Sequence, residues 1–213
     1  MTKPLLFLSA CAVGLFVLPD AQAETALLSH PNLVAWCIVP FDAKQRGPEE
    51  RAEMLERLGF TKFAYDWREQ HVPEFEAEIL ALKARGIAFH AFWGEHESMF
   101  ALFEKYGITP QVWKTAPSPR DGTQTEKVEA AARELLPLVE RTRALGCKLG
   151  LYNHGGWGGE PENLVAVCAW LRQHADAQHV GIVYNFHPAH DRIADFPACL
   201  ALMQPYLLCI NLN

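Results

Sequence analysis

Side chains suited to acid–base or metal chemistry gather in the second half of the chain. His187 and His190 are three positions apart, and His154 lies in a separate glycine-rich stretch. Imidazole moves protons near neutral pH and binds divalent metals such as zinc or manganese. His154, His187 and His190 are therefore predicted metal ligands, and His187 and His190 are also predicted catalytic acid–base groups. A structural role is the alternative for each.

Carboxylates, amides and indoles follow other apolar runs. Glu95 is a further predicted catalytic group, and a surface or helix-capping charge is the alternative for it. Tryptophan and asparagine suit a sugar, because the indole stacks on its apolar face and the amide bonds its hydroxyls. The predicted substrate-binding residues are Asn153, Asn185, Trp93, Trp157, Asp66 and Asn211.

These candidates follow strand-like apolar runs that alternate with helical patterns. The predicted strands cover 33–39, 62–65, 88–92, 111–114, 148–152, 180–184 and 207–212. The predicted helices cover 47–58, 73–85, 97–106, 125–145, 161–175 and 195–203. Strict alternation predicts parallel strands joined by right-handed crossovers, as in a doubly wound sheet or a closed barrel.

A barrel is favoured, because no glycine-rich phosphate fingerprint follows the first strand and polar residues end nearly every strand. The predicted fold is an α/β, TIM-type (β/α) barrel whose active site lies at the C-terminal ends of its strands. Such barrels typically need about 250 residues, so about seven strands are expected, with the last unit missing. An incomplete and inactive gene product is an alternative.

Residues 1–23 have the pattern of a secretory signal peptide. Lys3 precedes the apolar run Leu5–Leu18, and Ala21-Gln22-Ala23 is a small-x-small cleavage pattern. The protein is expected to be exported to the periplasm or secreted, with 24–213 as one barrel domain and no stable membrane span. Lipidation at Cys11 is a less favoured alternative.

Composition narrows the possible partners. The formal net charge of −6 provides no basic stripe for phosphates, so nucleic acid is not an expected partner and a small molecule is. The cysteines outside the first 23 residues are odd in number and lack CxxC spacing, which predicts small core side chains. Composition does not indicate the oligomeric state.

Three segments resemble strands of one known superfamily. Residues 150–156 and 180–187 resemble the fifth and sixth strands of the sugar phosphate isomerase/epimerase, or xylose isomerase-like, TIM barrels, and 208–213 resembles the seventh. The resemblance implies a sugar or keto-sugar substrate and proton abstraction next to a carbonyl. It also implies a divalent metal, Mn, Mg or Zn, held largely by carboxylates.

The chain departs from that pattern at the implied ligand positions, which hold Tyr152, Asn185 and Asn211. Neutral side chains are poor replacements for carboxylates around a hard dication. A displaced metal site built from the three histidines remains open. The expectation is therefore an exported enzyme similar to sugar isomerases or epimerases, for which assistance by a metal remains open. A non-catalytic carbohydrate-binding barrel is the alternative.

Overall fold

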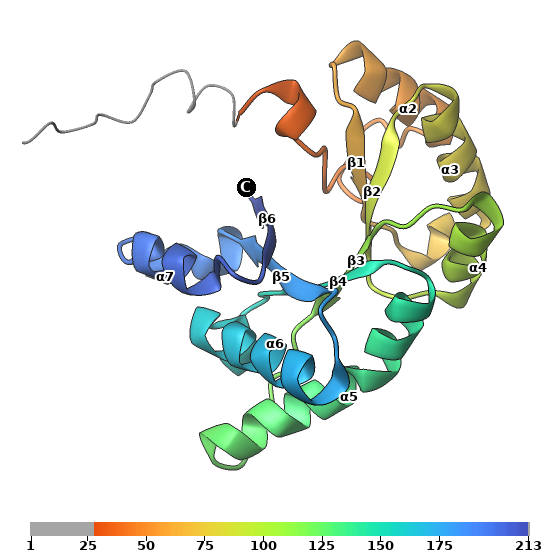
Figure 1. Ribbon diagram of the computed structural model, residues 1–213. Helices are drawn as coiled ribbons and strands as arrows, with labels where there is room; N and C mark the ends of the chain where they lie inside the picture. Colours follow the sequence, from red (N-terminus) through yellow and green to blue (C-terminus); the bar gives the residue numbers. More distant parts are fainter. Residues whose placement is uncertain (1–27, 213) are drawn as a thin grey trace, which may run out of the picture.

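The computed structural model describes residues 28–212 (Figure 1). The predicted signal peptide and Asn213 lie outside the described residues. Six parallel strands form one sheet in chain order: β1 (Lys62–Tyr65), β2 (Ala88–Trp93), β3 (Gln111–Thr115), β4 (Lys148–Tyr152), β5 (Val180–Asn185) and β6 (Leu207–Asn211). All of these strands were predicted, with boundaries that differ by a residue at most.

Helices connect the strands and cover the outer face of the curled sheet (Figure 1). The α-helices are α2 (Pro48–Arg57), α3 (Phe75–Ala84), α4 (Glu97–Tyr106), α5 (Gln124–Ala144), α6 (Pro161–Ala175) and α7 (Phe196–Met203). The short 3-10 helices are η1 (His30–Asn32), η2 (Glu69–Glu74), η3 (Trp157–Gly159) and η4 (His187–Arg192). The architecture is that of an incomplete TIM barrel, as the sequence predicted.

The first predicted strand, 33–39, is present only as a single bridge. Ala35 pairs with Phe63 in parallel, through bonds from the Ala35 amide to the Lys62 carbonyl and from the Ala64 amide to the Ala35 carbonyl. Cys37 then adopts a positive φ of 60°, which turns the chain out of the extended conformation, and Pro40 cannot donate to a ladder. The prediction of a full strand here is wrong.

Helix ends follow the local chemistry that the sequence displays. Pro48 and Pro161 occupy the first turns of α2 and α6, where an amide hydrogen is not needed. Thr123 and Glu126 form a reciprocal capping box at the start of α5, with the Glu126 carboxylate accepting from the Thr123 amide at 2.7 Å. Gly107 ends α4 in the left-handed conformation. These signals fix where each strand–helix unit turns.

The buried side chains form two cores on opposite faces of the sheet. The larger core lies between the sheet and the helices and includes Phe63, Phe92, Leu149 and Ile182. The inner core lies on the concave face and consists of Ala64, Ala91, Trp113, Tyr152 and Val183. A filled interior of this kind is what a barrel requires.

Gly150 makes room for the inner core. It is paired in register with Trp113 on β3, and an added Cβ would lie 2.5 Å from Val183 Cγ2 and 3.0 Å from Trp113 Cδ1. Only a glycine lets the Trp113 indole lie across β4 at this level. The five cysteines of the described residues are all free, and Cys147, Cys168 and Cys199 are buried as the sequence predicted.

Between residues 28 and 212, no helix combines the length and the apolar character needed to cross a membrane.

Candidate active site at the barrel mouth

A cavity of about 390 Å³ opens at the C-terminal ends of the strands. The residues that line it come from the segment after the bridge at Ala35, from the loops after β1, β4 and β5, and from the ends of β2, β4 and β5. They are Trp36, Cys37, Phe41, Asp66, Arg68, Trp93, Tyr152, His154, Asn185 and His187. The cavity volume lies within the range of small-molecule sites in proteins. The predicted place of the active site therefore contains a cavity.

Aromatic rings form the inner wall of the cavity. The Trp93 and Tyr152 rings meet edge to face, with centroids 4.1 Å apart, and the Trp36 ring lies 6.2 Å from each of them. Trp113 lies behind them in the inner core, 6.4 Å from Tyr152. These rings come from four separate segments and hold one another in place.

A carboxylate on another side of the cavity is held by two neighbours. Asp66 is buried at the end of β1 and accepts hydrogen bonds from Arg68 at 2.6 Å and from the Cys37 thiol at 3.4 Å. Burial, and then the charge of Asp66, raise the pKa of Cys37 to about 12. The thiol is thus a neutral donor at physiological pH, and the Asp66 carboxylate is fixed in orientation.

Tyr152 and Asn185 meet beside the ends of β4 and β5. The Asn185 side-chain nitrogen donates to the Tyr152 hydroxyl, and the Asn185 side-chain oxygen accepts from the main-chain amide of His187 at 2.9 Å. Burial raises the pKa of Tyr152 to about 12, although the amides of Asn211 and Asn185 oppose that rise. The exposed side chains of His154 and His187 also line the cavity.

Several of the predicted site residues lie off the cavity lining. Asn153 is buried, and both its side-chain nitrogen and its side-chain oxygen form hydrogen bonds with the main chain of Asn185. It therefore connects two strands. Glu95 pairs with Lys114 at 2.5 Å on the surface. Trp157 donates to Gln124 at 3.0 Å.

Asn211 and His190 also lie outside the lining residues. Asn211 is buried at the end of β6, where its side-chain oxygen accepts from Cys209. The His190 ring is exposed, with its centroid 6.0 Å from that of His187. The cavity thus brings together Asp66, Trp93, His154, Asn185 and His187 out of the predicted set.

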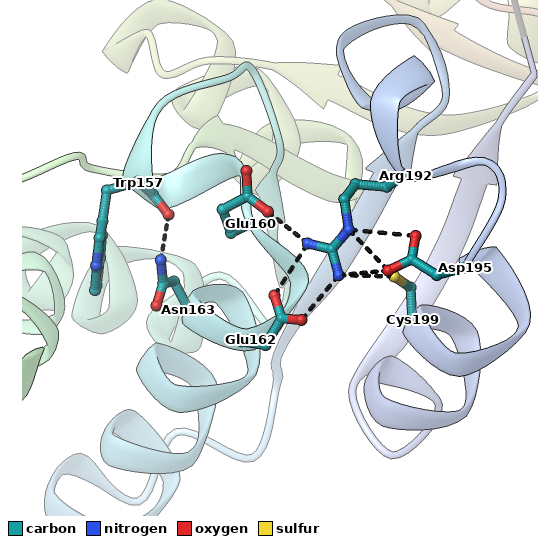
Figure 2. A network of polar contacts seen from close by, with 7 residues as sticks. All are labelled: Trp157, Glu160, Glu162, Asn163, Arg192, Asp195 and Cys199. Atoms are coloured by element: carbon teal, nitrogen blue, oxygen red, sulfur yellow. Dashed lines mark hydrogen bonds and ion pairs between the residues drawn. The ribbon is translucent and has the colours of Figure 1, made fainter.

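Arg192 anchors the turn that carries His187. Figure 2 shows its guanidinium among the carboxylates of Glu160, Glu162 and Asp195, which it contacts at 2.6, 2.9 and 3.0 Å. It also donates to Cys199 of α7. Glu160 and Glu162 stand at the start of α6, so Arg192 ties η4 to the neighbouring strand–helix unit. Its three anionic partners raise the pKa of Arg192.

The residues at the implied metal positions do not fit a hard dication. Tyr152 and Asn185 bond each other, Asn211 accepts from a thiol, and none of the three is an anion. Across residues 28–212, His, Cys, Asp and Glu side chains form no group of three that could hold a metal ion. This includes His154, His187 and His190, so the predicted histidine metal site is not formed in the structure.

Residues that the prediction omitted complete the cavity. Cys37 and Phe41 line it where the positive φ at Cys37 redirects the chain, a conformation that nothing in the sequence signals. Trp36 lies just before that turn, within the predicted first strand. Arg68 and Tyr152 lie at predicted strand ends, so position alone could have identified them.

The sequence matches no protein-family model and no curated protein. Its fold matches solved structures. A 3-keto-D-glucoside 4-epimerase from E. coli aligns with a TM-score of 0.60 and 14% identity over 83% of this chain and 77% of the epimerase. A xylose isomerase-like TIM barrel protein from Mycobacterium smegmatis, solved with magnesium, aligns with a TM-score of 0.56 and 14% identity over 84% of this chain and 74% of that protein. A D-psicose 3-epimerase from Clostridium cellulolyticum aligns with a TM-score of 0.57 and 9% identity over 83% of this chain and 71% of the epimerase.

The fold and the position of the cavity define an incomplete α/β barrel with a cavity of small-molecule size at its C-terminal mouth. More particularly, the chain has the xylose isomerase-like TIM-barrel fold, the fold of the sugar epimerases to which it is similar.

Proposed function

We propose that the mouth binds a sugar or keto-sugar derivative and isomerises or epimerises it by proton transfer next to a carbonyl. The observation that carries this proposal is one cavity in which the rings of Trp36 and Trp93 accompany the imidazoles of His154 and His187. Indole faces suit the apolar face of a sugar ring, and imidazoles suit proton transfer at neutral pH.

In the proposed reaction one imidazole removes the proton from the carbon next to the substrate carbonyl. The C–H electron pair becomes the C=C bond of an enediol or enediolate, and the carbonyl oxygen takes up the displaced electron pair. Return of a proton to the opposite face gives the epimer, and its return to the neighbouring carbon gives the isomer. One proton leaves carbon and one proton returns, so the reaction needs no oxidant or reductant. His154 and His187 are the proposed acid–base pair.

The similarity to known epimerases supports the same proposal. Two of the matched structures are named as a 3-keto-D-glucoside 4-epimerase and a D-psicose 3-epimerase. Both names describe a carbohydrate that carries a carbonyl group. We therefore propose ketoses and keto-glycosides as the first substrates to test.

The test follows exchange of substrate hydrogens with solvent deuterium by NMR. His154→Gln and His187→Gln should each lower exchange and turnover by about 10²- to 10⁴-fold, as expected for loss of an acid–base group. His190→Gln is the matched control, because its ring is exposed near His187 but does not line the cavity. Unchanged turnover in both cavity variants would rule out the proposed roles.

A non-catalytic carbohydrate-binding barrel is the second candidate function. The neutral set Tyr152, Asn185 and Asn211 favours it, because the carboxylates implied at these positions are absent from them. This candidate predicts that the same sugars bind the cavity while their hydrogens do not exchange with solvent.

A further inference from the structure

We infer that the mouth binds its sugar without a divalent cation, and that the Tyr152 hydroxyl donates a hydrogen bond to an oxygen of the bound sugar. The inference rests on the proposed function. It adds a substrate-contacting residue that the sequence placed only among missing metal ligands.

The first argument comes from charge at the strand ends. Tyr152, Asn185 and Asn211 end three consecutive strands, β4, β5 and β6, and carry no carboxylate. The carboxylate that does line the cavity, Asp66, is already paired with Arg68 at 2.6 Å and bonded by Cys37. A hard dication would therefore meet a largely neutral donor set, which provides little attraction for it.

The second argument comes from the unused proton of the Tyr152 hydroxyl. Its oxygen accepts from the Asn185 side-chain amide and also faces the Asn211 amide, and neither contact uses the hydroxyl as donor. A phenol carries one donor hydrogen in addition to its acceptor lone pairs. Because Tyr152 borders the cavity, a sugar oxygen bound there can accept that hydrogen.

The third argument is that the hydroxyl is held in a fixed position. Trp93 packs edge to face on the Tyr152 ring, and Trp36 and Trp113 lie 6.2 and 6.4 Å from it. Asn185 is fixed in turn, since its main-chain amide donates to Asn153 at 2.6 Å. A donor held before the substrate arrives costs little reorganisation on binding.

The metal half of the inference is tested on the full chain after dialysis against a chelator. Calorimetric titration with the keto-sugar that binds best should give the same affinity in chelator and after Mn²⁺ is restored. Equilibrium dialysis with Mn²⁺ alone should show no stoichiometric binding. Sugar affinity that is lost in chelator and recovered with Mn²⁺ would overturn this half.

The Tyr152 half is tested with Tyr152→Phe and a series of deoxy analogues of the same sugar. Loss of one hydrogen bond to a bound ligand should weaken affinity by about tenfold. The wild type should discriminate against one deoxy analogue, and the variant should bind that analogue as well as the parent sugar. An equal loss of affinity for every analogue would show a structural role and overturn the assignment.

Tyr184→Phe is the matched control. Tyr184 is also a buried tyrosine on the sheet, its hydroxyl has no hydrogen-bond partner among the described residues, and its ring packs against Phe186 and Phe196 away from the cavity. Removing that hydroxyl should leave sugar affinity unchanged.

Failure of the two proposals can be told apart. If no sugar in the panel binds the wild type, the proposed function fails, and Mn²⁺ dialysis still decides the metal half. Stoichiometric Mn²⁺ binding in that case would overturn the inference as well. If sugars bind in chelator but Tyr152→Phe binds every analogue like the wild type, the inference fails and the proposed function stands.

Discussion

The Asn153 side chain bonds both main-chain polar groups of Asn185. Its Nδ2 donates to the Asn185 carbonyl at 2.9 Å, and its Oδ1 accepts the Asn185 amide at 2.6 Å. The last main-chain pair of β4 and β5 is Tyr152 with Val183, so this amide extends the connection between the strands beyond their ladder. The position of Asn185 at the cavity depends on it.

Asn153→Ala should therefore destabilise the fold. It leaves a buried amide and a buried carbonyl of Asn185 without partners, which costs about 2–4 kcal/mol of unfolding free energy. Urea denaturation measures this, with the exposed Gln204→Ala as control. An Asn153→Ala variant as stable as the control would show that the two bonds contribute nothing.

Gly150→Ala should be destabilising for a steric reason. The new methyl group would meet Val183 Cγ2 at 2.5 Å, and overpacking of a filled core costs about 1–3 kcal/mol. Gly47→Ala is the control, because its φ is −70° and an added Cβ meets no atom within 4 Å. The same denaturation measurement compares the two. Equal stabilities would mean that the barrel interior relaxes around the methyl group.

Arg192→Gln should lower the turnover rate while the protein remains folded. The substitution removes the ion pairs that hold η4, and with it His187, against the start of α6. A displaced acid–base group costs on the order of tenfold in rate. Arg133→Gln removes an exposed ion pair with Glu129 instead and should leave turnover unchanged. Steady-state kinetics would contradict the anchoring role if both variants matched the wild type.

His90 should make the fold sensitive to acid. Burial, together with the charges of Lys62 and Lys148, lowers its pKa from the ordinary 6.5. Because this pKa is lower in the folded state, the contribution of His90 to stability is fully present above about pH 6.5. That contribution is lost as the pH falls through the folded-state pKa. The unfolding free energy of the wild type should thus fall more steeply below that pH than that of His90→Gln.

The control for this pH dependence is His174→Gln, which removes an exposed imidazole on α6. It should follow the wild-type curve. Parallel curves for the wild type and His90→Gln would exclude His90 as the source of acid sensitivity.

Export predicts a processed N-terminus. If residues 1–23 are a signal peptide, the protein from a periplasmic or culture fraction should begin at Glu24, as read by intact mass. Ala23→Arg should block cleavage and leave the longer chain. A wild-type protein that keeps Met1 in the cytoplasmic fraction would refute export.

The strand–helix pattern was predictable because each unit carries its own signals. Pro48 and Pro161 mark helix starts, Gly107 marks a helix end, and the apolar runs between them match the observed strands. The C-terminal mouth followed from parallel topology alone, since all strand ends then meet at one edge. Asp66, Trp93, His154, Asn185 and His187 were placed at the mouth in this way, and these five residues line the cavity.

The rest depended on contacts between segments far apart in the sequence. The role of Asn153 is set by the Asn185 main chain, and that of Glu95 by Lys114 on the next strand. The turn at Cys37 that brings Phe41 to the cavity needs a positive φ at a cysteine, which no local propensity predicts. Which polar side chain faces the cavity is thus a property of the assembled barrel.

The aromatic wall also has an optical consequence. Three of the six tryptophans, Trp36, Trp93 and Trp113, lie with ring centroids 6.2 to 6.5 Å apart around Tyr152. Excitation energy passes readily between indoles at such separations, so half of the indole absorption of the protein feeds chromophores at or beside the mouth. About half of the intrinsic indole signal therefore reports on this region, and no label is needed to follow what enters it.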